Sequence, residues 1–131
     1  MNKYTLKSPV SLNVAADASM MLIVRLTTAG VVTRAGLTID AMDNLKIATE
    51  EACSCLIGQA NPPRRIALNY NCADNHLCIA LRAEDCDCPQ GEMDEAEMDV
   101  VRCILESLAD SVHFDIRDGW IHTIELRSAI V

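Results

Sequence analysis

Two pairs of alternating segments constrain the fold of this chain more than any other feature of its sequence. The runs RIALNYNC (65–72) and HLCIALRA (76–83) each alternate apolar and polar residues, and only three residues separate them. The C-terminal run SVHFDIRDGWIHTIEL repeats the pattern around Asp118 and Gly119, a dipeptide that suits a type I′ turn. Because alternation with period two is typical of half-buried strands, we expect two β-hairpins.

Three further segments have the spacing of helices. The first runs to about Ala35 after a cap at Asp17 or Ser19, the second runs from a cap at Asp40 or Thr38 to about Gln59, and the third starts at Asp94. Gly36 is well placed as the left-handed residue that ends the first helix. The third helix is predicted to carry an apolar stripe of Met98, Val101, Leu105, Leu108 and Val112.

A strand over VSLNV (10–14) completes the order β, α, α, β, β, α, β, β. This order predicts an α/β two-layer sandwich, with helices on one face of a mostly antiparallel sheet. No low-complexity segment or composition shift marks a linker, so residues 1–131 are expected to form a single domain.

Charge and cysteine content limit the function. The formal net charge is -8 with a pI near 4.7, and such an acidic protein repels the phosphates of nucleic acids, so we expect no nucleic-acid partner. The N-terminal segment 1–17 lacks the apolar core of a signal peptide, and the apolar run 20–24 is too short to span a bilayer. We therefore expect a cytoplasmic protein with no membrane segment, whose seven cysteines are reduced.

Two adjacent glutamates stand in the apolar helical segment LKIATEEACSCLI (45–57). On a helical wheel Glu50 lies roughly opposite the buried stripe, whereas Glu51 lies toward its rim, one turn before Cys55. A carboxylate at that rim could reach the cleft between helix and sheet. It could equally extend to solvent or pair with Arg64 or Arg65.

The segment DNLKIATEEACSCLI resembles the N-box helix of the anti-sigma factor/serine-protein kinase family, within the GHKL ATPase superfamily. The preceding segment RLTTAGVVTRAGLTIDAMDNLKIA is similar to the same family, and the resemblance covers residues 10–60 well and the remainder by order of elements. It implies a fold like that of the GHKL and histidine-kinase ATPases, in a bacterial regulator of transcription. The resemblance implies that the N-box glutamate, here Glu51, acts as general base or orients the attacking hydroxyl in phosphoryl transfer from ATP, so Glu51 is the catalytic candidate.

The nucleotide site of that family is only partly present. Cys55 replaces the asparagine that binds Mg²⁺, and a thiol is a poor ligand for this hard cation. Glu84 and Asp85 stand where the family has an adenine-reading aspartate followed by glycines, but no glycine occurs here before Gly91. In the following segment GEMDEAEMDVV, Asp94, Glu95, Glu97 and Asp99 stand where the family binds phosphates, and their charges would repel a triphosphate. We therefore expect a degenerate domain, with Cys55, Glu84 and Asp85 non-functional, Glu51 vestigial or a rim charge, and no ATP or Mg²⁺ bound.

Five consecutive apolar residues on the first helix, Met20 to Val24, cannot all face one sheet. Either the domain covers the helix on both sides, or part of the helix forms an interface. The resemblance implies that the first helix and a sheet edge mediate homodimerisation and binding to a sigma factor, with an anti-sigma antagonist as competitor. Met20, Met21, Val24 and Arg25 are the candidate partner contacts, although core packing and a solvated charge are the ordinary alternatives.

The cysteines suggest a rival class of function. Cys86 and Cys88, with Cys72 and Cys78, could form a thiolate metal site or a redox switch, but their spacing does not match structural zinc sites. Buried free cysteine is common, so we expect no metal.

The residues together favour a protein-interaction module without enzyme activity. It would act as an anti-sigma-factor-like regulator, occluding a partner without phosphorylating it. The alternative is an active ATP-dependent serine-protein kinase with an altered nucleotide pocket and Glu51 as its base.

Overall fold

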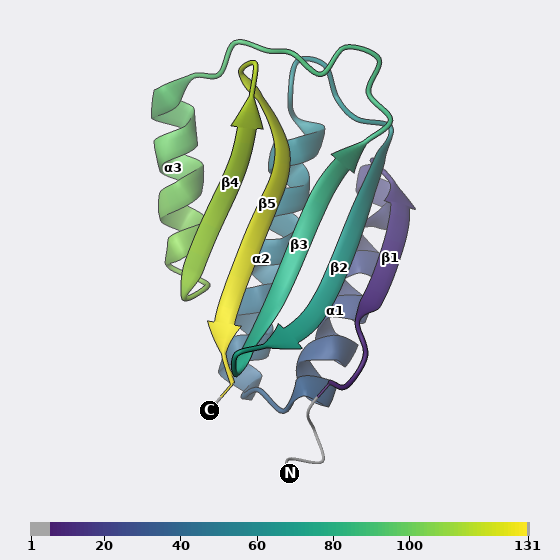
Figure 1. Cartoon of the computed structure of the whole chain (residues 1–131), viewed down its shortest axis with the longest axis vertical. Helices are drawn as coiled ribbons and strands as arrows, with labels where there is room; N and C mark the ends of the chain where they lie inside the picture. Colours follow the sequence, from purple (N-terminus) through teal and green to yellow (C-terminus); the bar gives the residue numbers. More distant parts are fainter. Residues whose placement is uncertain (1–5, 131) are drawn as a thin grey trace.

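The computed structural model describes residues 6–130, so residues 1–5, part of the segment tested for a signal peptide, lie outside the described residues. The elements are β1 (Val10–Ala15), the 3₁₀ turn η1 (Ala18–Met20), α1 (Met21–Ala35), α2 (Ile39–Ile57), β2 (Arg65–Ala73), β3 (His76–Glu84), α3 (Glu95–Glu106), β4 (Ser111–Arg117) and β5 (Trp120–Ala129). The three helices lie on one face of the sheet (Figure 1). The predicted order of elements and the two-layer α/β fold class are confirmed.

One antiparallel sheet of five strands contains both hairpins, in the order β1-β2-β3-β5-β4. Asp74 and Asn75 turn the first hairpin with φ of 52° and 61°, and Asp118 and Gly119 turn the second with φ of 54° and 68°. Left-handed φ values at both turn residues match the right-handed twist of the flanking strands. Both predicted hairpins are therefore confirmed, with turns made by the residue types that tolerate this backbone.

Local capping fixes the helix ends. The carboxylate of Asp17 accepts a hydrogen bond from the Ser19 amide at the entry to η1 and α1. Gly36 ends α1 with φ of 82°, as predicted. Of the two caps considered for α2, Thr38 is the one used, because its hydroxyl accepts the Ala41 amide at 3.1 Å.

The third helix is shorter than its predicted apolar stripe. Asp94 caps α3 as expected, but α3 ends at Glu106, so Leu108 lies beyond it and Val112 belongs to β4. Within α3 only Met98 and Leu105 are buried. The prediction of one continuous stripe was wrong because an apolar residue in the following strand happened to fit the helical spacing.

The core lies between the helices and the inward side of the sheet. Its largest fully buried side chains include Tyr70 in β2 and Leu45 in α2. The Tyr70 hydroxyl lies 2.9 Å from the buried Thr28 hydroxyl of α1, so the phenol is hydrogen-bonded within the core. The outward sheet face is polar, as expected for an antiparallel sheet covered on one side.

Residues 18–35 are, by length and composition alone, apolar enough to cross a bilayer, with a mean hydropathy of 1.2. The prediction that no membrane segment is present rested only on the shorter run 20–24. The buried residues of α1 are Val24, Thr28, Val31, Val32 and Ala35. These five side chains are buried within the domain, although only 28% of the window 18–35 as a whole is buried.

Candidate functional site

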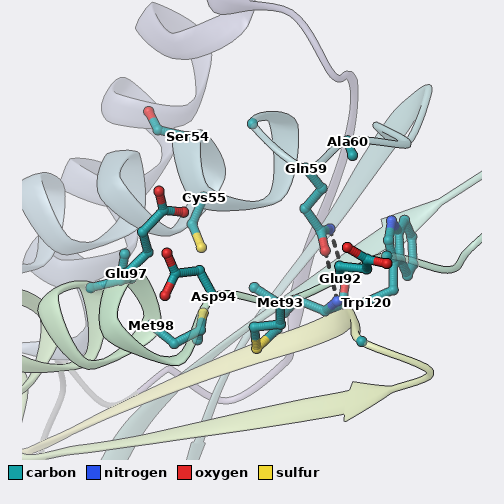
Figure 2. A pocket seen from close by; sticks show the side chains of 15 residues that line it. Ser54, Cys55, Gln59, Ala60, Glu92, Met93, Asp94, Glu97, Met98 and Trp120 are labelled. Carbon is teal, nitrogen blue, oxygen red and sulfur yellow. Dashed lines mark hydrogen bonds between the residues drawn. The ribbon is translucent and has the colours of Figure 1, made fainter.

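An open pocket of about 450 Å³ lies between the C-terminal end of α2, the start of α3 and the turn of the second hairpin. Its apolar lining consists of Ala60, Met93, Met98, Val101, Trp120 and Ile121. Ser54, Cys55 and Gln59 line it from the α2 side (Figure 2). The pocket therefore lies beside the position at which the resemblance places the Mg²⁺ ligand.

Negative charge dominates this pocket. Glu92, Asp94 and Glu97 line it, and none of its lining residues within 6–130 is Lys, Arg or His. Figure 2 shows the carboxylates of Asp94 and Glu97 and the thiol of Cys55 pointing into the same space. Like charges repel at short range, so this lining disfavours a polyphosphate.

Cys55 is an uncharged thiol at neutral pH. Burial, followed by the nearby Glu51 carboxylate, raises its pKa to about 11. The thiolate is the form of cysteine that acts as nucleophile and metal ligand, so the side chain offers little of either activity.

The two adjacent glutamates have separate environments. Glu50 turns toward α1, where its carboxylate accepts a hydrogen bond from Arg25 Nε at 2.5 Å. Glu51 is half-buried on the side of Cys55, as predicted, but is not among the residues that line the pocket. The helical wheel placed Glu50 opposite the buried stripe but did not predict its contact with α1. A helical wheel contains no information about the neighbouring helix.

Glu84 lies on the wrong side of the sheet for a nucleotide pocket. Its carboxylate accepts hydrogen bonds from Arg82 at 2.9 Å and from Asn13 at 3.2 Å on the polar face. The preceding residue, Ala83, is buried on the opposite face, as strand alternation requires. Glu84 is therefore separated from Cys55 by the sheet.

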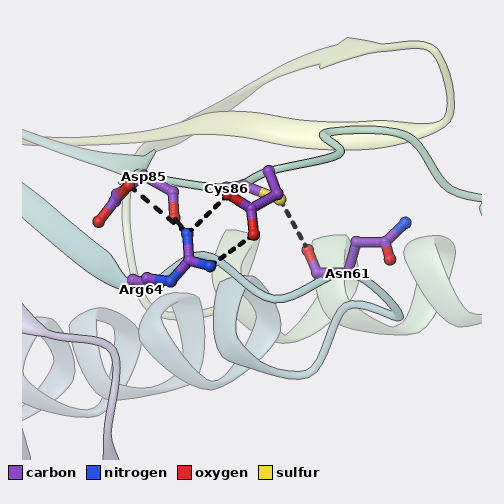
Figure 3. A network of polar contacts seen from close by, with 5 residues as sticks. Asn61, Arg64, Asp85 and Cys86 are labelled. Carbon is purple, nitrogen blue, oxygen red and sulfur yellow. Dashed lines mark hydrogen bonds and ion pairs between the residues drawn. The ribbon is translucent and has the colours of Figure 1, made fainter.

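Asp85 faces Arg64 instead of the pocket. Its Oδ1 lies 3.6 Å from Arg64 Nη1, and its backbone has φ of 61° (Figure 3). The same guanidinium donates to both carboxylate oxygens of Asp87, at 3.0 and 2.5 Å, and this pairing lowers the pKa of Asp87. Arg64 and Arg65 thus have partners other than Glu51, since Arg65 donates to Asn13.

The loop between β3 and α3 is fastened to the rest of the domain. Asn61 connects three segments, since its carbonyl accepts from Trp120 Nε1 at 2.8 Å and from Cys86 Sγ at 3.4 Å (Figure 3), and its side chain donates to the Gln90 carbonyl at 2.6 Å. The amide of Gly91 donates to Asp118. The hydrogen bonds that hold this loop could not be predicted from the sequence, because they join residues far apart in the chain.

Gln59 connects the end of α2 to β5 at the edge of the pocket. Its amide nitrogen donates to the Ile121 carbonyl at 3.1 Å, and its amide oxygen accepts from the Ile121 amide at 2.7 Å (Figure 2). The Gln59 side chain thus hydrogen-bonds to the backbone of β5 just beyond the end of α2. These two bonds hold this wall of the pocket in place.

The candidate partner contacts differ in accessibility. Val24 is fully buried, so the prediction that it contacts a partner was wrong. Met20 and Met21 are half-buried against the core, and Arg25 is exposed but pairs with Glu50. The exposed large apolar residues of α1 are instead Leu22, Ile23 and Leu26, none of which was among the predicted contacts.

The cysteines do not assemble a thiolate site. Cys72 pairs with Leu77 and Cys78 pairs with Asn71 across β2 and β3, so the two thiols lie on opposite faces of the sheet. Within residues 6–130, no group of three or more His, Cys, Asp and Glu side chains is placed to hold a metal ion.

Comparison with known proteins relates the sequence to one group of regulators. The chain is 33% identical over 74 residues to the serine-protein kinase RsbW of Bacillus thuringiensis, and 39% identical over 51 residues to that of Bacillus mycoides. The matched part of the chain is thus similar to proteins named serine-protein kinase RsbW. The match to the B. thuringiensis RsbW covers 55% of the chain and 46% of that protein, and the match to the B. mycoides RsbW covers 39% and 32%. No protein-family model matches the sequence.

The fold is that of an RsbW domain. A crystal structure of the RsbU and RsbW domains of Rv1364c from Mycobacterium tuberculosis superposes with a TM-score of 0.72 over 94% of this chain and 32% of that one. Sequence identity in this superposition is 12%, so the likeness concerns the fold. The expected GHKL-like fold is thereby confirmed, whereas the chain spans less than half the length of the RsbW relatives.

Proposed function

We propose that this RsbW-like domain is a bacterial, cytoplasmic anti-sigma-factor-like regulator that acts by binding protein and does not bind Mg-ATP. The charge of the pocket carries the proposal: three carboxylates and a neutral thiol surround a space without a basic side chain. A triphosphate needs positive charge or free helix-terminal amides around it. Here the carboxylate of Asp94 already accepts the Ala96 amide at the start of α3.

Glu51 is then a vestige of the catalytic position. The positions that would cooperate with it are dispersed, since Glu84 lies on the polar sheet face and Asp85 pairs with Arg64. The relatives are named serine-protein kinases, so an active kinase is the competing function. Phosphorylation of an antagonist protein by radiolabelled ATP, abolished in Glu51→Gln, would establish the kinase and overturn our proposal.

The exposed side of α1 supports the protein-binding part of the proposal. Leu22, Ile23 and Leu26, which we term the α1 surface, are 56%, 45% and 61% exposed. Leu22 and Leu26 lie one helical turn apart and so form a continuous apolar patch beside Arg25. Because α1 is apolar on both its buried and its exposed sides, a homodimer partner or a sigma factor would cover this surface.

Charging the α1 surface should abolish association while the domain stays folded. We expect the double variant Leu22→Glu/Leu26→Glu to be monomeric in light scattering, and to lose binding to sigma factors or antagonists from the same bacterium in the absence of nucleotide. Buried carboxylates at an apolar interface cost several kcal/mol, which would weaken binding by more than about a hundredfold.

Val100→Glu is the matched control, because Val100 is similarly exposed, at 60%, but lies on α3. This variant should associate like the original protein. Equal association by the Leu22→Glu/Leu26→Glu variant would show that the α1 surface is not the interface.

A further inference from the structure

The pocket between α2 and α3 combines an apolar floor with an acidic rim. Met93, Met98 and Trp120 contribute to the floor, and Glu92 and Glu97 are exposed at the rim (Figure 2). Among residues 6–130, no cation forms an ion pair with either of these two glutamates. The carboxylates are therefore available to a charge from outside the domain.

The backbone of α2 adds to this negative field. The C-terminal end of α2 reaches the pocket at Ser54, Gly58 and Gln59, and no basic residue lies in its last turn. A helix C-terminus carries partial negative charge and favours a cation. The opposing positive end of α3 is offset by its Asp94 cap and by Glu97, which lines the pocket from the first turn.

We infer that this pocket binds the side chain of an arginine or lysine presented by a partner protein. Such a side chain has an aliphatic stem and a cationic tip, so the stem would lie on the methionines while the tip reaches the carboxylates. A pocket of about 450 Å³ accommodates one side chain of this size. This inference and the proposed function have one premise in common, which is that the pocket does not hold nucleotide. The inference does not depend on the α1 surface.

The test uses butylguanidinium as a mimic of the arginine side chain and butylurea as its neutral counterpart of equal shape. We expect butylguanidinium to shift the amide resonances of Gln59, Met93 and Glu97 saturably, with a dissociation constant on the order of 1 mM. Butylurea should produce no saturable shift, because it lacks the charge that the carboxylates would bind.

Charge-removing variants locate the site. In Asp94→Asn/Glu97→Gln, where asparagine still caps α3, the affinity for butylguanidinium should fall by roughly tenfold. Glu95→Gln removes a charge from the same helical turn, but Glu95 does not line the pocket, so this variant should bind normally. Unfolding curves of the variants would confirm that each remains folded.

Three outcomes would overturn the inference: equal binding of butylurea, shifts spread over acidic residues outside the pocket, or equal loss of affinity in Glu95→Gln. None of these outcomes concerns nucleotide binding, so each leaves the proposed function intact. Saturable binding of Mg-ATP in the same spectra would instead contradict both the inference and the proposed function. Failure of the inference alone can therefore be distinguished from failure of the proposed function.

Discussion

Gly119→Ala is expected to destabilise the domain by roughly 2–4 kcal/mol, a fall in melting temperature on the order of 10 °C. A Cβ atom at Gly119 would lie 2.0 Å from the Gly91 carbonyl oxygen, and the residue has φ of +68°. The obstructing atom belongs to backbone that is itself hydrogen-bonded to Asp118, so it cannot move aside cheaply. Thermal unfolding followed by circular dichroism would measure the effect.

Gly30→Ala provides the matched control. No atom lies within 4 Å of a Cβ built at this position in α1, and alanine is favoured over glycine in helix interiors by up to about 1 kcal/mol. The control variant should be as stable as the original protein or more stable. If Gly119→Ala were equally stable, the loop would not be fastened to the second hairpin as described.

The domain should lose stability as the pH rises above about 9, because buried groups hold their protons more tightly when folded. Burial raises the pKa of Cys53 to about 12 and that of Tyr70 to about 12, from ordinary values of 9.0 and 10.0. A folded-state pKa raised above the unfolded one contributes stability that is complete below the unfolded pKa and is lost between the two values. Cys55, whose pKa burial raises to about 11, contributes in the same way, so we expect a loss on the order of 3 kcal/mol between pH 7.5 and pH 10 in urea unfolding.

Cysteine variants separate the contributions to this loss of stability at alkaline pH. Cys53→Ala removes the most strongly shifted group, so its pH dependence should be smaller by about 1 kcal/mol, whatever its stability at neutral pH. Cys103→Ala, which removes an exposed thiol on α3, is the matched control for the loss of a cysteine. An unchanged slope in Cys53→Ala would mean that the thiol is accessible to solvent in the folded protein.

Local signals in the sequence predicted the secondary structure well. The turn residues at 74–75 and 118–119, the Gly36 helix end and the Asp94 cap each act through nearby backbone, so the residues that encode them are adjacent in the chain. The third helix was overextended for the same reason, because a local pattern continued into β4 by chance.

The candidate site was predicted less well, because its geometry depends on contacts between distant segments. The fold brings the Cys55 thiol together with Asp94 and Glu97, which are far from it in the sequence. The resemblance grouped Glu84 and Asp85 with Cys55, although strand alternation turns Glu84 to the other face and Arg64 holds Asp85. The pairing of Arg25 with Glu50 requires knowledge of how α1 and α2 pack.

Calorimetric titration with Mg-ATP and Mg-ADP is the most direct test of the central claim that the pocket rejects nucleotide. We predict no saturable heat at nucleotide concentrations up to about 1 mM, because the pocket presents carboxylates and a protonated Cys55 thiol where phosphates and Mg²⁺ would lie. A dissociation constant in the micromolar range would contradict this account.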